Sequence, residues 1–383
     1  MLLFLGISTQ AQTALENGDI AYGARNFKQA ISYYERAMNE GKSDLSLQLK
    51  LAHSYRFVND MLNAEKMYAS ACQNPSTDPI NFYYYGSVLK ANKKYTASKM
   101  AFDRFGDKHP NLGQMAQASC DFALQLNQQP ALFTVHAETG ISSPIYDDYA
   151  PVLHQGSLIF TSARQTKHDA LPGGFSNPST QNFLYRATIA NDGSLTNPMV
   201  IKNEEAVIPT TNIAPFAITS SEKFAVSTYN EFSNGIRHTH SASLNRLSME
   251  MHLRMEKIED FVPGDEFPHT LQKSASFPAF ANQGQSIYFA MYGYEGGYGG
   301  FDLWVIHQKE GKWSNPINLG ENVNSPGDEI CPNLDQDGRL YFSSDFHKGL
   351  GGYDIFTAQN IAGSWQEIRN LGREVNSSFD DLY

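Results

Sequence analysis

Two patterns of apolar and polar positions divide the chain. In the first third, small and aromatic residues recur at a fixed distance of 34 residues, and apolar residues follow helical spacing between residues 111 and 128. After Gln129 and Pro130, β-branched and aromatic residues alternate with polar ones in short runs separated by Gly, Pro, Asn and Asp. Such runs are typical of many short strands. The pattern therefore predicts a multidomain α-then-β protein: a helical part followed by an all-β part.

Five columns of residues carry the period of 34. They are Gly18, Ala52 and Gly86; Phe27, Met61 and Tyr95; Ala30, Ala64 and Ser98; Tyr34, Tyr68 and Phe102; and Ala37, Ala71 and Phe105. We expect the small residue of each unit to lie where two helices cross closely, with an aromatic side chain filling the gap beside it. Pro75 and Pro110 fall near the ends of units two and three, where a proline is expected to end the second helix.

These columns resemble the tetratricopeptide repeat. The resemblance covers about residues 11–110, and with a capping helix over 111–128 it implies a helical α-solenoid domain over 12–128. It also implies that the first helix of each unit lines a concave groove that binds an extended peptide or a partner helix. The groove positions carried over from the family are Leu15, Asp19 and Tyr22; Leu49, His53 and Arg56; and Tyr83, Ser87 and Lys90.

Two basic residues stand at equivalent groove positions. Arg56 and Lys90 are one repeat apart, so we expect that they can meet a carboxylate together; the alternative is that both are simply solvated. The paired Lys and Asn of chaperone-binding clamps are absent, since Leu49 and His53 stand there. A chaperone tail is therefore not the expected ligand.

A second repeat, with a spacing of 52 residues, organises the β part. Residues 300–304 recur as 352–356, 318–320 as 370–372, Asn324 as Asn376, and Trp313 as Trp365. Ahead of them stands an element most complete at residues 328–344, with fainter copies at 148–162, 212–227 and 276–289. Four units are visible, each predicting a four-stranded sheet with a tight Asp-Gly turn.

This unit resembles the TolB-type, WD-like β-propeller blade, which implies a propeller over 130–383. Longer intervals between the first units predict loop insertions around 165–181 and 229–272, the second containing a strand near Leu247 to Met255. Residues 376–383 align with the opening of a blade. Because a propeller has to close, we expect a five- or six-bladed ring that needs chain beyond Tyr383, with Leu132 to Val135 as its closing outer strand.

Charge and cysteine content exclude several classes. The 383 residues include 29 Lys plus Arg and 40 Asp plus Glu, a net charge of −11, so nucleic acid is not an expected partner. Three widely spaced cysteines without a CxxC pair exclude a disulfide scaffold and a cysteine zinc site. Residues 1–11 look like a partial signal peptide ending at Ala11, although no basic residue precedes its apolar run; the alternative is the frayed start of the first helix. No segment has transmembrane length.

Candidate catalytic groups are few. The Gly-x-Ser-x-Gly elbow of hydrolases is absent. His238 and His240 would share one face of a strand and can be interpreted as a metal pair or, as we expect, as part of a polar strand or turn. Acidic residues recur at fixed registers of the repeat, which indicates a scaffold rather than chemistry. We therefore expect structural roles for Asp302, Asp354, Asp328, Trp313 and Trp365, and no catalytic residue, metal or cofactor.

The order of the two modules resembles the PorE-like envelope proteins of Bacteroidetes, in which they precede an OmpA-like peptidoglycan-binding domain. The resemblance implies a non-catalytic periplasmic scaffold at the outer membrane, associated with type IX secretion, whose partners are other envelope proteins or peptide segments. The sequence has no OmpA-like segment and no lipobox cysteine near Ala11, so peptidoglycan attachment would need a domain outside this chain. The alternative is a carbohydrate-binding or carbohydrate-processing propeller with a helical accessory domain.

Overall fold

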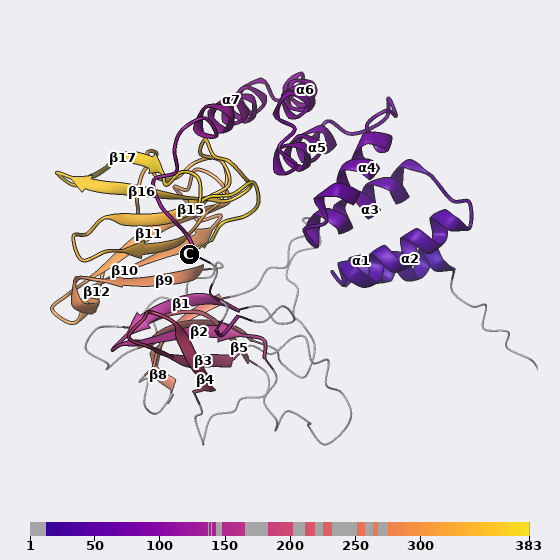
Figure 1. Ribbon diagram of the computed structural model, residues 1–383. Coiled ribbons are helices and arrows are strands. Elements are labelled where there is room, and N and C mark those ends of the chain that lie inside the picture. The colour runs from indigo at the N-terminus through magenta and orange to yellow at the C-terminus, as the bar shows by residue number, and fades with distance from the viewer. Residues whose placement is uncertain are drawn as a thin grey trace, which may run out of the picture. The chain divides into compact units, whose positions relative to one another are not determined.

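The computed structural model describes residues 13–136, 138, 140–142, 148–164, 183–201, 211–218, 225–231, 251–256, 263–266 and 275–382. The chain divides into two compact units. The first takes in residues 1–130 with 348–352, and the second takes in 131–347 with 353–383. The division falls where the repeat period changes. Helices make up the first unit and strands the second (Figure 1).

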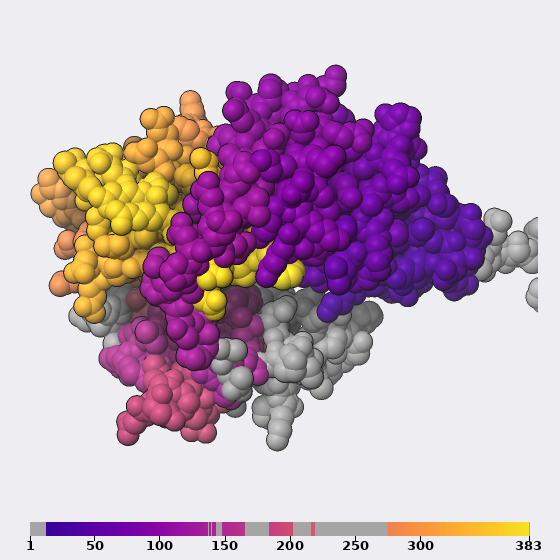
Figure 2. All heavy atoms as spheres, turned by 45° about the horizontal axis from the view of Figure 1, so that its top comes forward, coloured from indigo at the N-terminus to yellow at the C-terminus, as the bar shows by residue number. Residues whose placement is uncertain are grey.

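Six helices of the first unit form three consecutive pairs, and a seventh follows. They are α1 (Ala14–Gly23), α2 (Phe27–Asn39), α3 (Leu45–Phe57), α4 (Met61–Ala71), α5 (Ile80–Ala91), α6 (Tyr95–Gly106) and α7 (Pro110–Leu126). Each helix packs on the next, which gives the stacked arrangement of a helical repeat. The space-filling view shows these helices, in indigo to purple, as one continuous body (Figure 2).

The helix ends follow from local sequence signals. Thr13 forms a capping box with Glu16 at the start of α1, and Asp44 caps α3 through the backbone N–H of Leu47. Pro110 differs from expectation. Helix α6 already ends at Gly106, and Pro110 instead begins α7, because a proline at the first helical position gives up an N–H that has no partner there.

The two helices of a repeat cross closely at the position where the sequence repeats a small residue. A Cβ added at Gly18 would lie 2.5 Å from the ring of Tyr34, and one at Gly86 would lie 2.6 Å from the ring of Phe102. Both rings are buried. The aromatic side chain of the second helix thus occupies the space left by the glycine of the first, as the repeat predicts.

The strands of the described ranges form four antiparallel sheets, each built from strands consecutive in the sequence. The first contains β1 (Asp148–His154), β2 (Ser157–Ser162), β3 (Phe183–Ile189) and β4 (Leu195–Val200); the second β5 (Thr211–Ile218), β6 (Ala225–Glu231), β7 (Met251–Glu256) and β8 (Pro263–Glu266); the third β9 (Ala275–Ala281), β10 (Ser286–Tyr292), β11 (Phe301–Lys309), β12 (Lys312–Trp313) and β13 (Ile317–Asn318); the fourth β14 (Glu329–Leu334), β15 (Leu340–Ser344), β16 (Asp354–Ile361) and β17 (Ser364–Asn370). A 3-10 turn, η1 (Asn282–Gly284), joins β9 to β10.

The sheets pack face to face like the blades of a propeller. The first strands of successive sheets contact one another, β1 with β5, β5 with β9 and β9 with β14. A buried cluster including Tyr288, Leu303, Phe342, Phe356 and Trp365 fills the space between the third and fourth sheets. Neither sheet can bury its apolar face alone, so this packing carries much of the stability of the β unit.

In two successive 52-residue units, an asparagine side chain makes the same hydrogen bonds to the backbone. Asn324 accepts from the backbone N–H of Leu303 at 2.7 Å and donates to its carbonyl at 3.0 Å. Asn376 makes the same pair of bonds with Ile355, at 2.7 and 2.9 Å. The asparagine amide thus bonds the N–H and C=O of one strand residue, as a neighbouring strand would, and holds the turn that carries the asparagine against that strand.

Several sequence expectations lie outside the described residues: the segment 1–11, the insertion at 165–181, His238, His240 and most of 229–272. Leu132 and Val135 are described, are 77% and 54% exposed, and belong to no strand. Among the described residues they pair with no strand, so the closing strand over Leu132 to Val135 stays a prediction. Among the described residues, no helix has the length and hydropathy needed to cross a membrane.

Candidate functional site

The candidate site is the surface formed by α1, α3 and α5, the first helices of the three repeats, which we call the first-helix face. It carries the residues that the sequence places in a ligand groove. Asp19 and Tyr22 lie on α1, His53 and Arg56 on α3, and Lys90 on α5. The structure gives these side chains four different surroundings.

A neutral histidine joins the three helices. His53 Nδ1 lies 3.2 Å from Tyr22 Oη, and His53 Nε2 lies 3.2 Å from Asn81 Oδ1. Asn81 donates its amide nitrogen to the carbonyl of Asp78, which leaves its oxygen facing His53. The His53 Nε2 therefore carries the proton and Nδ1 accepts from Tyr22. Burial, and then the charge of Arg56, lower the pKa of His53 to about 4, so the ring is neutral at pH 7.

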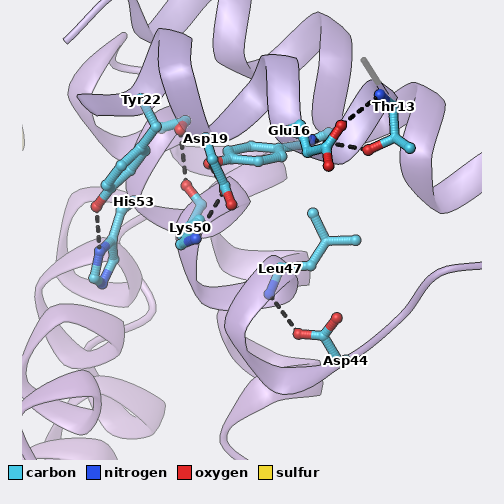
Figure 3. A network of polar contacts seen from close by, with 10 residues as sticks. Thr13, Glu16, Asp19, Tyr22, Asp44, Leu47, Lys50 and His53 are labelled. Carbon is cyan, nitrogen blue, oxygen red and sulfur yellow. Dashed lines mark hydrogen bonds and ion pairs between the residues drawn. The ribbon is translucent and has the colours of Figure 1, made fainter. Parts of the chain in front are cut away.

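Asp19 has two donors of its own. Tyr34 Oη and Lys50 Nζ both donate to Asp19 Oδ1 at 2.8 Å, and Figure 3 shows Lys50 reaching Asp19 from the neighbouring helix. The Asp19 side chain is 44% exposed. Its charge is thus balanced within the protein, and α1 is tied to both α2 and α3.

Arg56 is held by aromatic rings. Its Cζ lies 4.5 Å from the centre of the Phe57 ring and 4.6 Å from the centre of the Tyr84 ring. Its Nε is buried and has no hydrogen-bond partner in the described part of the chain. Stacking fixes the plane of the guanidinium. Burial raises the pKa of the neighbouring Tyr68 hydroxyl, and the charge of Arg56 opposes that rise.

Lys90 differs from its equivalent Arg56. It is only 8% exposed, and its Nζ donates to Ser119 Oγ at 2.9 Å and to the carbonyl of Gly351 at 2.8 Å. Gly351 belongs to the segment 348–352 that forms part of the same compact unit. The ammonium is used internally, so the expected pairing of Arg56 with Lys90 on one carboxylate does not match this structure.

The other predicted positions contribute packing. Leu15 and Leu49 are partly buried against the core of the first two repeats. The Tyr83 ring contacts Phe102 and Phe105, with centroids 5.7 and 5.2 Å apart. Ser87 Oγ donates to the Tyr83 carbonyl within α5. Binding by these residues stays a prediction.

The acids of the β unit hold its turns. Asp302 accepts from the backbone N–H of Tyr298 at 3.1 and 3.0 Å. Asp328 Oδ1 accepts from Phe301 N at 2.8 Å, and its Oδ2 accepts from Tyr353 Oη at 3.1 Å.

The remaining residues of this set are buried or lie against the core. Asp354 and Trp365 are buried, and Trp313 packs against a core cluster of the third sheet. Asp148, at the start of β1, forms an ion pair with Arg164 at 2.7 Å. In the described ranges, no group of three or more His, Cys, Asp and Glu could hold a metal ion.

Sequence reasoning missed the partners of the site. Phe57, Tyr84, Asn81 and Lys50 stand outside the family's groove positions, yet they hold Arg56, His53 and Asp19. The available signal was the cluster of aromatic residues at the start of α5.

No family model matches the chain, and no curated protein sequence matches it. Solved structures align with it at low identity. TolB from Agrobacterium tumefaciens is 14% identical with a TM-score of 0.34, over 60% of this chain and 64% of its own. A prolyl endopeptidase is 11% identical with a TM-score of 0.32, over 60% of this chain and 29% of its own. An exo-β-1,3-galactanase from Clostridium thermocellum is 12% identical with a TM-score of 0.28, over 57% of this chain and 60% of its own. The alignments thus span less than two thirds of the length of each of these proteins.

Proposed function

We propose that this protein is a non-catalytic scaffold of the periplasm that binds other envelope proteins through the first-helix face, at the outer membrane and in association with type IX secretion. The observation that carries the proposal is the pairing of a helical repeat with blades whose repeated acids Asp302 and Asp328 are engaged in backbone contacts. Acids that hold the turns around the third and fourth sheets support a framework rather than a reaction centre.

The face has the features of a protein-binding surface. It presents aromatic side chains together with a stacked arginine, residue types that are enriched in the centres of protein interfaces. Phe57 is 52% exposed beside Arg56. An exposed aromatic ring next to a cation offers a partner both apolar area and a charged anchor.

Photo-crosslinking in the native host tests this function. A photoreactive amino acid placed at Phe57 reports on the first-helix face, and one placed at Met100, which is 68% exposed on α6, serves as the matched control. We expect Phe57 to crosslink a defined envelope protein in the periplasmic fraction and Met100 not to do so. Crosslinks from Met100 alone, or a protein found only in the cytoplasm, would contradict the proposal.

A further inference from the structure

The helical unit includes a short segment from far along the sequence. Residues 348–352 stand between β15 and β16 in the chain, yet they belong to the same compact unit as α1 to α7. Leu350 is only 3% exposed, although it stands between two glycines in a turn. It is part of a buried cluster whose other members lie on α6 and α7: Tyr95, Phe102, Cys120 and Ala123. The helices thus form an apolar pocket that Leu350 fills.

Hydrogen bonds hold the backbone on both sides of Leu350. Ser119 Oγ, on α7, accepts from the N–H of Gly349 at 3.1 Å and donates to the Gly349 carbonyl at 3.2 Å. Lys90 Nζ, on α5, donates to the Gly351 carbonyl at 2.8 Å and to Ser119 Oγ at 2.9 Å. Lys90 is buried, and a buried ammonium is costly unless acceptors face it. Because the segment supplies one of these acceptors, the helical unit is complete at α5 only when the segment is in place.

The equivalent turn of the third sheet shows what is particular to Leu350. The sequence Gly-Tyr-Gly-Gly-Phe of residues 297–301 recurs as Gly-Leu-Gly-Gly-Tyr at 349–353, so Tyr298 is the counterpart of Leu350. A Cβ added at Gly297 would lie 2.2 Å from a carboxylate oxygen, which indicates that this glycine serves the turn itself. Tyr298 is 48% exposed, whereas Leu350 is buried. The glycines are thus shared by both turns, and burial of the residue between them is specific to the copy at 348–352.

We propose that residues 348–352 act as an internal strap of the helical unit, with Leu350 as the anchor, and that this strap closes the α5 end of the first-helix face. The leucine side chain has no polar atom to satisfy in the pocket, and Ser119 and Lys90 bond only the backbone beside it. While the strap is in place, no other segment can occupy the pocket. The inference goes beyond the proposed function, because this site is filled by the chain itself.

The thiol of Cys120 can report on the strap, because it is fully buried in the same cluster as Leu350. The chain has three cysteines, so replacing Cys72 and Cys331 by alanine leaves Cys120 as the only thiol. The rate at which dithiobisnitrobenzoate reacts with the folded full chain then measures how often the pocket opens. Circular dichroism first establishes that each variant is folded.

In this background Leu350→Gly should raise the reaction rate of Cys120 by roughly tenfold or more, since glycine keeps the turn but gives up the burial of the leucine side chain. Leu350→Met should stay within about threefold of the parent, because methionine fills nearly the same volume. Tyr298→Gly is the matched control at the equivalent turn and should leave the rate unchanged. If Leu350→Gly does not fold, Leu350→Ala replaces it with the same expectation.

A second thiol separates local opening from a general loss of stability. With Cys72 as the only cysteine, Leu350→Gly should leave the rate unchanged, because Cys72 lies in a different buried cluster, with Phe82 and Phe105.

Three outcomes would overturn the proposal. If Leu350→Gly leaves Cys120 as slow as in the parent, the segment does not close the pocket. If Cys72 is accelerated as much as Cys120, Leu350 stabilises the whole helical unit rather than fastening a strap. If Tyr298→Gly accelerates Cys120 equally, the effect is not specific to this turn. None of these rates involves a partner protein, so a failure to crosslink at Phe57 bears only on the proposed function.

Discussion

The contrast between Tyr34 and Tyr68 predicts opposite effects from the same substitution. Tyr34→Phe removes a hydrogen bond of 2.8 Å to the carboxylate of Asp19. Bonds to charged groups contribute about 1.5–3 kcal/mol, and the partial exposure of Asp19 places this one near the lower end, at about 1.5 kcal/mol. Tyr68→Phe removes a buried hydroxyl that finds no acceptor among the described residues, since its neighbour Arg56 can only donate. That change should leave the free energy of unfolding unchanged or raise it by up to about 1 kcal/mol.

The assay is urea unfolding of the full chain, followed by far-ultraviolet circular dichroism, whose helical signal comes from the first unit. Tyr34→Phe should lower the transition midpoint, and Tyr68→Phe should leave it in place or raise it, with unchanged slopes. The difference of about 2 kcal/mol is well resolved for a helical unit of this size. Equal losses in the two variants would refute the reasoning, because they would show that Tyr68 has an acceptor that the geometry lacks.

Three further predictions concern helix packing, the asparagine-to-backbone hydrogen bonds of the β unit, and pH. Gly86→Ala should destabilise the helical unit by about 1–3 kcal/mol, because the added Cβ meets the ring of Phe102; Gly23→Ala, where nothing lies within 4 Å, should be neutral or stabilising, and similar melting of both variants would contradict this. Asn376→Ala should cost the β unit about 1–3 kcal/mol in thermal unfolding, since it leaves the partly buried N–H of Ile355 in strand β16 without its acceptor, while the Ile355 carbonyl keeps the N–H of Leu371; no loss would show that this hydrogen bond is dispensable. Burial raises the pKa of Glu329 to about 7 although three donors face its carboxylate. The folded state therefore holds its proton to higher pH than the unfolded state does, and stability of the β unit should fall as pH rises from about 4.5 to 7, while Glu329→Gln should flatten that slope.

Repeat spacing made the architecture readable from sequence. A glycine at one position and an aromatic residue sixteen positions later predict a close crossing of two helices, and the structure shows the Tyr34 ring in the space beside Gly18. Likewise the recurrence of Asn324 as Asn376 marks the same turn after successive sheets. Such contacts are local or repeat at one register, so each copy of the pattern carries the information needed to form them.

The chemistry of the candidate site was decided by contacts between repeats. Sequence put Arg56 and Lys90 at equivalent positions, but the structure gives Lys90 an acceptor at Gly351, 261 residues further along the chain. It also engages both nitrogens of His53 with side chains from α1 and α5, and leaves Arg56 stacked on rings. The repeat spacing determines which helices and strands lie side by side. Whether a charged side chain is buried, paired or open depends on the particular side chains that meet it across the fold, and these do not repeat.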